Sequence, residues 1–152
     1  MRRARIVAPV AVAAALFIAV IVAGQALARP NQATTAPLGP GAVTVTLTIH
    51  HSHFSPDHIS VRPGTTVRFV VNNLDPIGHE LIVGDAEVHR RHEAGTEPVH
   101  PPRPGEISVP AQTTAETTFR FEATNGDPVV YACHLPGHFR YGMTGEVSIV
   151  SS

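Results

Sequence analysis

The sequence predicts an all-β Greek-key β-sandwich of about eight short strands with one long histidine- and proline-rich insertion. Three observations predict it: short segments of strand-like composition recur between residues 43 and 150, Pro, Gly, Asn and Asp turns separate them, and no segment has the length and pattern of a convincing helix. With 43% hydrophobic and 15% charged residues among 152, the chain is too apolar and too weakly charged to be disordered.

The first predicted strand, residues 43–49, alternates apolar and polar residues with period two, so its apolar side chains face the core. Residues 54–57 follow as a turn. The other predicted strands are short, rich in β-branched or aromatic residues, and bounded by turn residues. They comprise residues 58–61, 66–73, 79–83, 106–109, 117–122, 129–133 and 145–150. Strands this short, joined by turns, favour antiparallel pairing in a sandwich.

Residues 85–105 depart from this pattern. The front of the segment, residues 85–94, can form one or two helical turns, whereas four prolines between residues 98 and 104 exclude regular structure from its back. A long insertion in a compact domain is usually functional or mobile. We therefore treat this segment as part of the functional question.

The N-terminal 28 residues are typical of an export signal. Three arginines in the first five residues precede an apolar run of about 19 residues, and residues 26–28 read Ala-Leu-Ala, a small-x-small cleavage pattern. The apolar run is also close to the length that spans a bilayer, so an uncleaved membrane anchor is the alternative to a cleaved signal peptide. Either way, we expect the folded part outside the cytoplasm, secreted or held at the outer face of the cell membrane.

Residues 29–42 are rich in Pro, Gly, Ala and Thr, a composition that predicts a flexible linker. The folded domain is then expected to occupy residues 43–152. About 110 residues suit a small β-sandwich.

Composition excludes several classes of protein and of metal centre. A formal net charge of −1 leaves no basic surplus, so we expect no binding to nucleic acid. The single cysteine, Cys133, excludes an intrachain disulfide, a cysteine-rich zinc site and a copper centre bridged by two thiolates. Ten histidines, by contrast, are an unusual number for this chain and direct attention to a metal site.

The strongest functional signal lies between residues 131 and 143. Cys133 would end a strand, His138 would lie on a tight Pro-Gly loop, and Met143 would lead into the next strand. A second imidazole must come from elsewhere, and His79 stands at a strand start directly after a glycine. Two histidines, one cysteine and a weak axial methionine make up the type 1 copper site. Soft sulfur suits Cu(I) and imidazole also suits Cu(II), so the set favours exchange of one electron.

The chain resembles the cupredoxins, the plastocyanin/azurin-like family of type 1 copper proteins, over most of residues 43–150. The resemblance rests on residues 54–57, 61–67 and 73–79, followed by the Cys–His–Met loop, in the order that the family uses. It implies a cupredoxin-like sandwich with one Cu(I)/Cu(II) ion per chain. The ligands that it implies are His79, Cys133, His138 and Met143.

These observations favour an exported one-electron carrier that is not itself an enzyme. Its partners would be respiratory or oxidase redox proteins, met through a small transient surface near His138. A copper-binding protein that delivers copper to an oxidase is the alternative, favoured by the histidine-rich insertion. A small copper enzyme is less favoured, because the type 2 or trinuclear copper site that it needs has no recognisable motif here.

Other histidines allow more than one interpretation. His89 and His92 are three residues apart and can share a helical face. With His100 they form either a solvated loop, or a second, looser copper or zinc site, or a cap over the type 1 site. His134 follows Cys133 directly, so its side chain should point to the opposite side of the strand, in a supporting or surface position.

Four residues near the expected ligands are predicted to support the site. Asn73 and Asp75 would tie the ligand loops together through hydrogen bonds from side chain to backbone. Phe139 and Tyr141 would shield the metal from water and so tune its potential.

Overall fold

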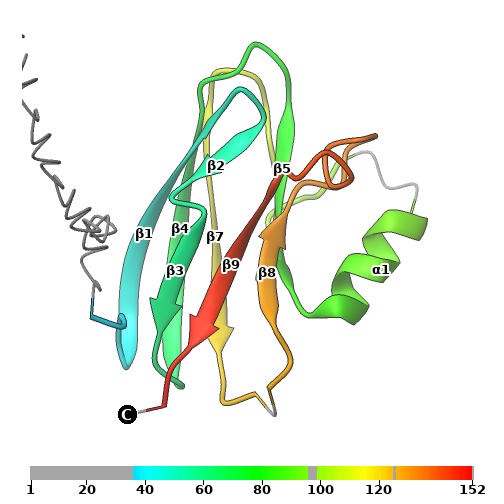
Figure 1. Cartoon of the computed structure of the whole chain (residues 1–152). Coiled ribbons are helices and arrows are strands. Elements are labelled where there is room, and N and C mark those ends of the chain that lie inside the picture. The colour runs from blue at the N-terminus through cyan, green and yellow to red at the C-terminus, as the bar shows by residue number, and fades with distance from the viewer. Residues whose placement is uncertain (1–35, 96–98, 125, 152) are drawn as a thin grey trace, which may run out of the picture. The chain divides into compact units, whose positions relative to one another are not determined.

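Two packed β-sheets form the part of the chain that the computed structural model describes, residues 36–95, 99–124 and 126–151 (Figure 1). The first sheet has the order β2 (His53–Ser55), β1 (Gly41–His50), β4 (Thr65–Asn73) and β7 (Thr114–Phe121). The second has the order β3 (His58–Val61), β9 (Thr144–Ile149), β8 (Val129–Ala132), β5 (His79–Gly84) and β6 (Glu106–Val109). A single helix, α1 (Ala86–Ala94), is present within the described ranges. The predicted all-β sandwich is confirmed.

The strand pattern differs from the prediction in two details. A ninth strand, β2, forms where a turn was predicted, because Phe54 pairs with Ile49 of β1 and buries its ring in the core. The pairing is also mixed rather than antiparallel throughout, since β1 runs parallel to β4 and β3 runs parallel to β9. Between the two strands of each parallel pair, the chain crosses to the other sheet and returns. The two strands of the pair therefore run in the same direction.

The folded part begins before the predicted boundary at residue 43. Leu38 lies inside the predicted linker 29–42, yet its amide donates to the Ser60 carbonyl and its carbonyl accepts from the Arg62 amide, both at 2.8 Å. Its side chain packs against the core. The predicted signal or anchor, residues 1–28, lies outside the described residues, and so do residues 29–35 of the predicted linker. No helix among the residues that the structure describes is long and apolar enough to cross a membrane.

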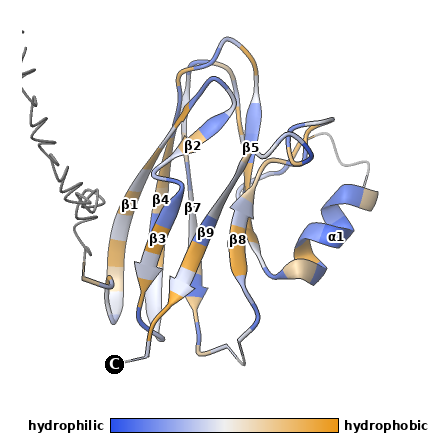
Figure 2. Cartoon of the chain, in the orientation of Figure 1, coloured by the Kyte–Doolittle hydropathy of each residue, from blue (hydrophilic) through white to orange (hydrophobic). Residues whose placement is uncertain are grey.

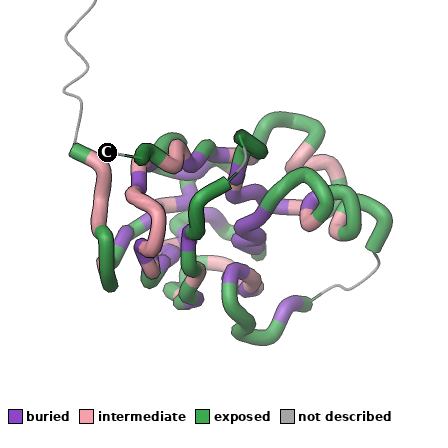
Figure 3. The backbone as a smooth tube through the Cα atoms, turned by 90° about the horizontal axis from the view of Figure 1, so that it is seen from below, coloured by how far each residue is buried: buried purple, intermediate pink, exposed green. Residues whose placement is uncertain are grey.

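Hydrophobic and hydrophilic residues alternate along the strands (Figure 2), and the buried residues gather between the two sheets, where they form the core (Figure 3). Tyr131 is fully buried at the centre of this layer, and its hydroxyl donates to the Pro56 carbonyl at 2.8 Å. Its ring covers Gly145 so closely that a Cβ there would lie 2.2 Å from ring atoms. Only glycine therefore fits at this point of β9, beside the loop that carries the predicted ligands.

Helix α1 takes up residues 86–94 of the segment 85–94 that was predicted to form helical turns, and Asp85 caps its N-terminus. The Asp85 carboxylate accepts from the Val88 amide at 2.9 Å, which satisfies one free N–H of the first turn. A Cβ at Gly84 would lie 2.6 Å from Val88, so glycine lets the helix approach the end of β5 closely. The helix thereby lies beside β8 and the loop that follows it (Figure 1).

Candidate metal centre

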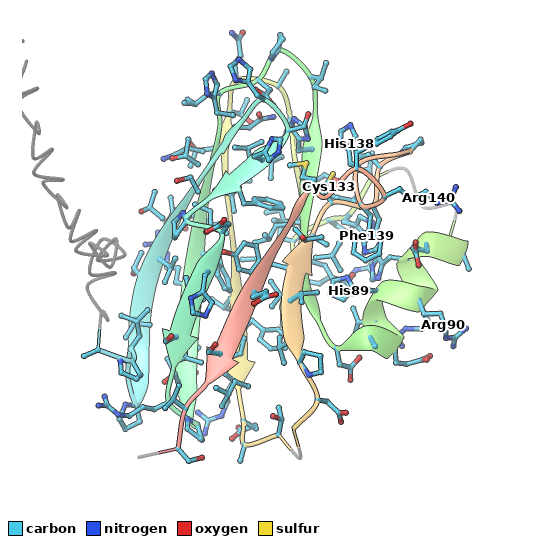
Figure 4. All side chains as sticks on the ribbon, in the orientation of Figure 1. His89, Arg90, Cys133, His138, Phe139 and Arg140 are labelled. Carbon is cyan, nitrogen blue, oxygen red and sulfur yellow. The ribbon has the colours of Figure 1, made fainter. Side chains whose placement is uncertain are left out.

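Three of the four predicted ligands meet at one end of the sandwich. His79 opens β5. Cys133 directly follows β8, and His138 lies in the loop between β8 and β9 (Figure 4). One donor atom of each residue lies within 4.8 Å of the donor atoms of the other two. The Cys133 sulfur is 3.2 Å from Nδ1 of His138, and the ring centroids of His79 and His138 are 4.9 Å apart.

Backbone hydrogen bonds hold the loop that carries His138 and Met143. The His138 amide donates to the Leu135 carbonyl at 2.9 Å, and the Met143 amide donates to the His138 carbonyl at 3.0 Å. The Cys133 amide then closes the loop on the Met143 carbonyl at 3.2 Å. Met143 is 1% exposed and belongs to the same buried cluster as Cys133. The fourth predicted ligand is thus buried at the foot of the loop.

Asp75 orients His79. Nε2 of His79 donates to the Asp75 carboxylate at 2.9 Å, and the same carboxylate accepts from the amides of His51 and Ser52 at 2.7 and 2.8 Å. Burial acts to raise the pKa of Asp75, but these hydrogen bonds together lower it below its ordinary value. The proton on Nε2 leaves a lone pair on Nδ1 of His79, which is buried and has no hydrogen-bond partner within the described residues.

Asn73 ties this loop to the neighbouring strands. Its side-chain amide donates to the carbonyls of Ile77, Val109 and Pro110 at 2.8, 3.1 and 3.0 Å. Its side-chain oxygen accepts from the Asp75 amide at 3.0 Å. The predicted hydrogen bonds from Asn73 and Asp75 to the backbone are therefore confirmed. These hydrogen bonds hold the chain before His79 and thereby fix the direction from which its side chain enters the site.

The electrostatics of the three groups fit a metal that binds thiolate and imidazole. Burial raises the pKa of the Cys133 thiol to about 11, so the free thiol keeps its proton at neutral pH and loses it only to a strongly bound ion. Burial, and then the neighbouring His79, lower the pKa of His138, which keeps that ring neutral at pH 7. A soft sulfur, two imidazoles and a buried thioether suit copper in both oxidation states.

The predicted shield of the metal is wrong for Tyr141, and the ring contacts of Phe139 within the described residues are with imidazoles beside α1, not with those of His79 and His138. Tyr141 is 89% exposed, so its ring does not cover the buried ligands. Phe139 instead packs on two imidazoles. Its ring stacks on His89 with centroids 5.8 Å apart and lies 4.5 Å from the His134 ring (Figure 4).

His134 lies on the other side of the strand from Cys133, as predicted. Cys133 belongs to the core cluster, whereas His134 lines a pocket beside α1. The His134 backbone amide donates to the Glu80 carboxylate at 2.7 Å, and its Nε2 lies 2.8 Å from Nδ1 of His89. Burial, and then the nearby imidazoles His89, His92 and His100, lower the pKa of His134 to about 4. Sequence reasoning missed Glu80, although a carboxylate inside the apolar segment 79–83 was a usable signal.

Known proteins with established names are similar to this chain in sequence or in fold. Copper-resistant cuproprotein CopI of Rubrivivax gelatinosus is 34% identical over 99 residues, which cover 63% of this chain and 59% of that protein. Its counterpart of the same name in Pseudomonas aeruginosa is 27% identical over 159 aligned positions, covering 83% of each chain. The structure of auracyanin B superposes with a TM-score of 0.59 at 22% identity, over 75% of this chain and 92% of auracyanin B.

The chain thus spans 59% of the length of its Rubrivivax relative, and its fold is shared with auracyanin B. The sequence model for copper binding proteins of the plastocyanin/azurin family matches residues 42–150, which include every strand of the sandwich except the first residue of β1. Copper is accordingly the cofactor, and this chain belongs to the plastocyanin/azurin family of copper-binding proteins.

Proposed function

We propose that this protein is an exported type 1 copper protein that passes single electrons between redox partners. His79, Cys133, His138 and Met143 hold its copper. The observation that carries the proposal is that three of these donors lie within 4.8 Å of one another in an arrangement held by hydrogen bonds of the protein itself. The N-terminal sequence supports export, with the folded part secreted or tethered to the outer face of the cell membrane.

A rigid ligand set suits electron transfer, because little structural change then accompanies a change of oxidation state. Asp75 fixes the His79 ring, and the loop hydrogen bonds fix His138 and Met143. Copper held there supplies a one-electron Cu(I)/Cu(II) couple. On this proposal the protein binds no substrate and is not an enzyme by itself.

The surface around His138 supports brief contacts with other proteins. Within the described residues, His138 is the only predicted ligand that is not fully buried. The loop before His79 exposes Leu74 and Ile77, and the loop after His138 exposes Tyr141. Exposed apolar side chains beside a redox centre suit a small transient interface, through which a redox protein can approach His138.

The first test is spectroscopic. The full chain loaded with copper should show the intense visible absorption of a thiolate–copper bond and a type 1 EPR signal. Cys133→Ser should lose both while keeping the near-UV circular dichroism of the fold, whereas His58→Gln, at an exposed histidine on β3, should retain both. Stoichiometric copper without the thiolate absorption in the native chain would overturn the proposal.

The second test addresses electron transfer. The reduced copper form should be oxidised rapidly both by a small inorganic oxidant and by a soluble haem electron carrier. Ile77→Glu should slow the reaction with the protein partner at least about tenfold and leave the reaction with the small oxidant unchanged, because it alters docking only. If neither reagent oxidised the reduced protein, the carrier role would be excluded.

Copper tolerance is a second candidate function, favoured by the name that the two relatives carry. In that role the protein would hold copper outside the cytoplasm or deliver it to an oxidase. Deletion of the gene should then sensitise cells to added copper, and copper should pass to a chelator or an acceptor protein within minutes. Growth of the deletion strain equal to the parent across copper concentrations would remove this candidate.

A further inference from the structure

A second cluster of metal-ligating side chains lies beside α1. His92 comes from the last turn of α1, His100 from the segment after it, and Glu106 opens β6. One donor atom of each lies within 4.8 Å of the other two. They line a pocket of about 550 Å³ together with Glu80 and His134. We propose that His92, His100 and Glu106 bind a divalent copper or zinc ion, at a site separate from the type 1 centre.

A hydrogen bond of the His92 ring determines which of its two nitrogens can bind a metal ion. Nδ1 of His92 lies 2.8 Å from the Val88 carbonyl, which can only accept, so Nδ1 carries the proton. Nε2 of the neutral ring then keeps its lone pair and faces the Glu106 carboxylate. When the His92 ring is neutral, two acceptors therefore face each other, and a cation between them would bond to both.

The spacing of the donors fits an ion between them. Nε2 of His92 is 3.7 Å from Oε1 of Glu106, and Nδ1 of His100 is 3.8 Å from Oε2 of Glu106. Both distances are too long for direct hydrogen bonds. They are close to the separation of about 3.4 Å between two ligands of a tetrahedral ion with bonds of about 2.1 Å.

Glu80 lies next to the three proposed ligands and contacts one of them, His100. Its Oε2 lies 3.3 Å from Nε2 of His100, while its Oε1 accepts from the His134 amide at 2.7 Å. The side chains of Glu80 and His100 are only 2% and 4% exposed. A metal-binding histidine is commonly oriented by a carboxylate that bonds to the ring nitrogen facing away from the metal. Glu80 occupies this position at Nε2 of His100, so Nδ1 of His100 is presented to the pocket.

The donor chemistry indicates which ion the site prefers. Two imidazoles and one carboxylate suit borderline divalent ions, and Cu²⁺ binds such sites more tightly than Zn²⁺. Two positive groups compete with the ion: the Arg103 guanidinium lies 3.5 Å from Oε2 of Glu106, and Arg91 lines the same pocket. The alternative to a metal is an ion-pair network, in which protonated His92 and His100 neutralise Glu80 and Glu106.

The experiment counts metal ions in the full chain. Copper is first loaded to one equivalent, and Cu²⁺ or Zn²⁺ is then added in separate titrations followed by desalting and metal analysis. We expect a second equivalent of either metal, with Cu²⁺ retained more tightly and giving a type 2 EPR signal. Glu106→Gln and His92→Gln should weaken this second binding at least about tenfold. Their type 1 absorption should be unchanged, which reports an intact fold.

Two control variants make the result decisive. His53→Gln alters the exposed histidines near β2, where adventitious metal would collect, and should keep the second equivalent. Cys133→Ser should lose the thiolate absorption yet still bind metal at His92, His100 and Glu106, so failure of the proposed function and failure of this inference are distinguishable. The inference is overturned if no second equivalent binds with either metal, or if Glu106→Gln and His92→Gln bind it as tightly as His53→Gln.

Discussion

The two ligand clusters of this protein are built in different ways. His79, Cys133 and His138 stand at the ends of neighbouring strands and on one short loop, where hydrogen bonds from Asn73 and Asp75 hold the chain around His79. The pocket beside α1 instead collects its donors from a helix, the segment after it, and the start of β6. The first cluster therefore depends on the sandwich, and the second on how the insertion packs against the sandwich.

Strand geometry connects the two clusters. His79 and Cys133 face the first cluster, while their chain neighbours Glu80 and His134 line the pocket. Successive side chains of a strand point to opposite sides, so one pair of strands supplies residues to both. The copper site and the pocket beside α1 thus share the same two strands and lie on opposite sides of them.

The largest expected effect lies on the sandwich side of the comparison. Asn73→Ala removes the donor for three carbonyls and the acceptor for the Asp75 amide, in buried or partly buried surroundings. We expect the free energy of unfolding of the metal-free protein to fall by about 3 kcal/mol, measured by urea denaturation. Asn72→Ala, which loses one hydrogen bond to the Thr114 hydroxyl, should cost about 0.5 kcal/mol. Equal losses would show that Asn73 does not brace the site.

The pH dependence of copper binding sharpens the distinction between a thiolate site and an imidazole–carboxylate site. The pKa of the free Cys133 thiol is about 11, so between pH 8 and pH 6 the thiol carries a proton that copper must displace. Apparent Cu(I) affinity should therefore fall about tenfold for each unit by which the pH is lowered. Competition with a Cu(I) chelator at each pH measures it. Cys133→Ser should flatten this slope, and a native slope near zero would contradict the assignment of Cys133.

Asp75→Asn tests how strongly the orientation of His79 matters. The substitution keeps the size of the side chain but removes the charge that accepts from His79, His51 and Ser52. We expect copper affinity to fall about tenfold, with a shifted midpoint potential. Asp127→Asn, at an exposed loop position, is the matched control and should change neither quantity. An affinity unchanged by Asp75→Asn would mean that the loop alone fixes the ring.

Asp85→Ala acts on the helix side of the comparison. Loss of the N-cap should lower the free energy of unfolding by about 1 kcal/mol and weaken the second metal site, because α1 carries His92. The type 1 absorption should stay the same. Glu93→Ala, an exposed change on the same helix, should leave both metal sites intact. If Asp85→Ala altered the type 1 spectrum, the two clusters would not be structurally independent.

Tyr141→Ser should have the smallest effect. The ring lies in the ligand loop but is 89% exposed, so its removal should leave the absorption maximum and the midpoint potential of the copper-loaded protein unchanged within error. A clear shift of the potential would show that the ring folds over the metal once copper is bound.

Much of the sandwich and of the first cluster could be predicted from sequence, because both rest on short-range patterns. Alternation placed the strands, and the spacing of Cys133, His138 and Met143 fitted one loop. Strand β2 was missed because three residues, 53–55, are too few for a periodic signal, and its pairing with β1 closes only in the folded protein. The exposure of Tyr141 was missed because the place of an aromatic residue in the sequence, close to the ligands, does not tell on which side of the loop its ring lies.

What the sequence determined by itself was therefore the all-β class, the copper chemistry of one cysteine among histidines, and the side of the strand on which His134 lies. Only the tertiary structure decided that Glu80, His92, His100 and Glu106 share one pocket. The physical reason is that periodicity and ligand spacing are local properties of the chain. The pocket, by contrast, depends on how a capped helix and a proline-rich segment pack against strands distant in sequence.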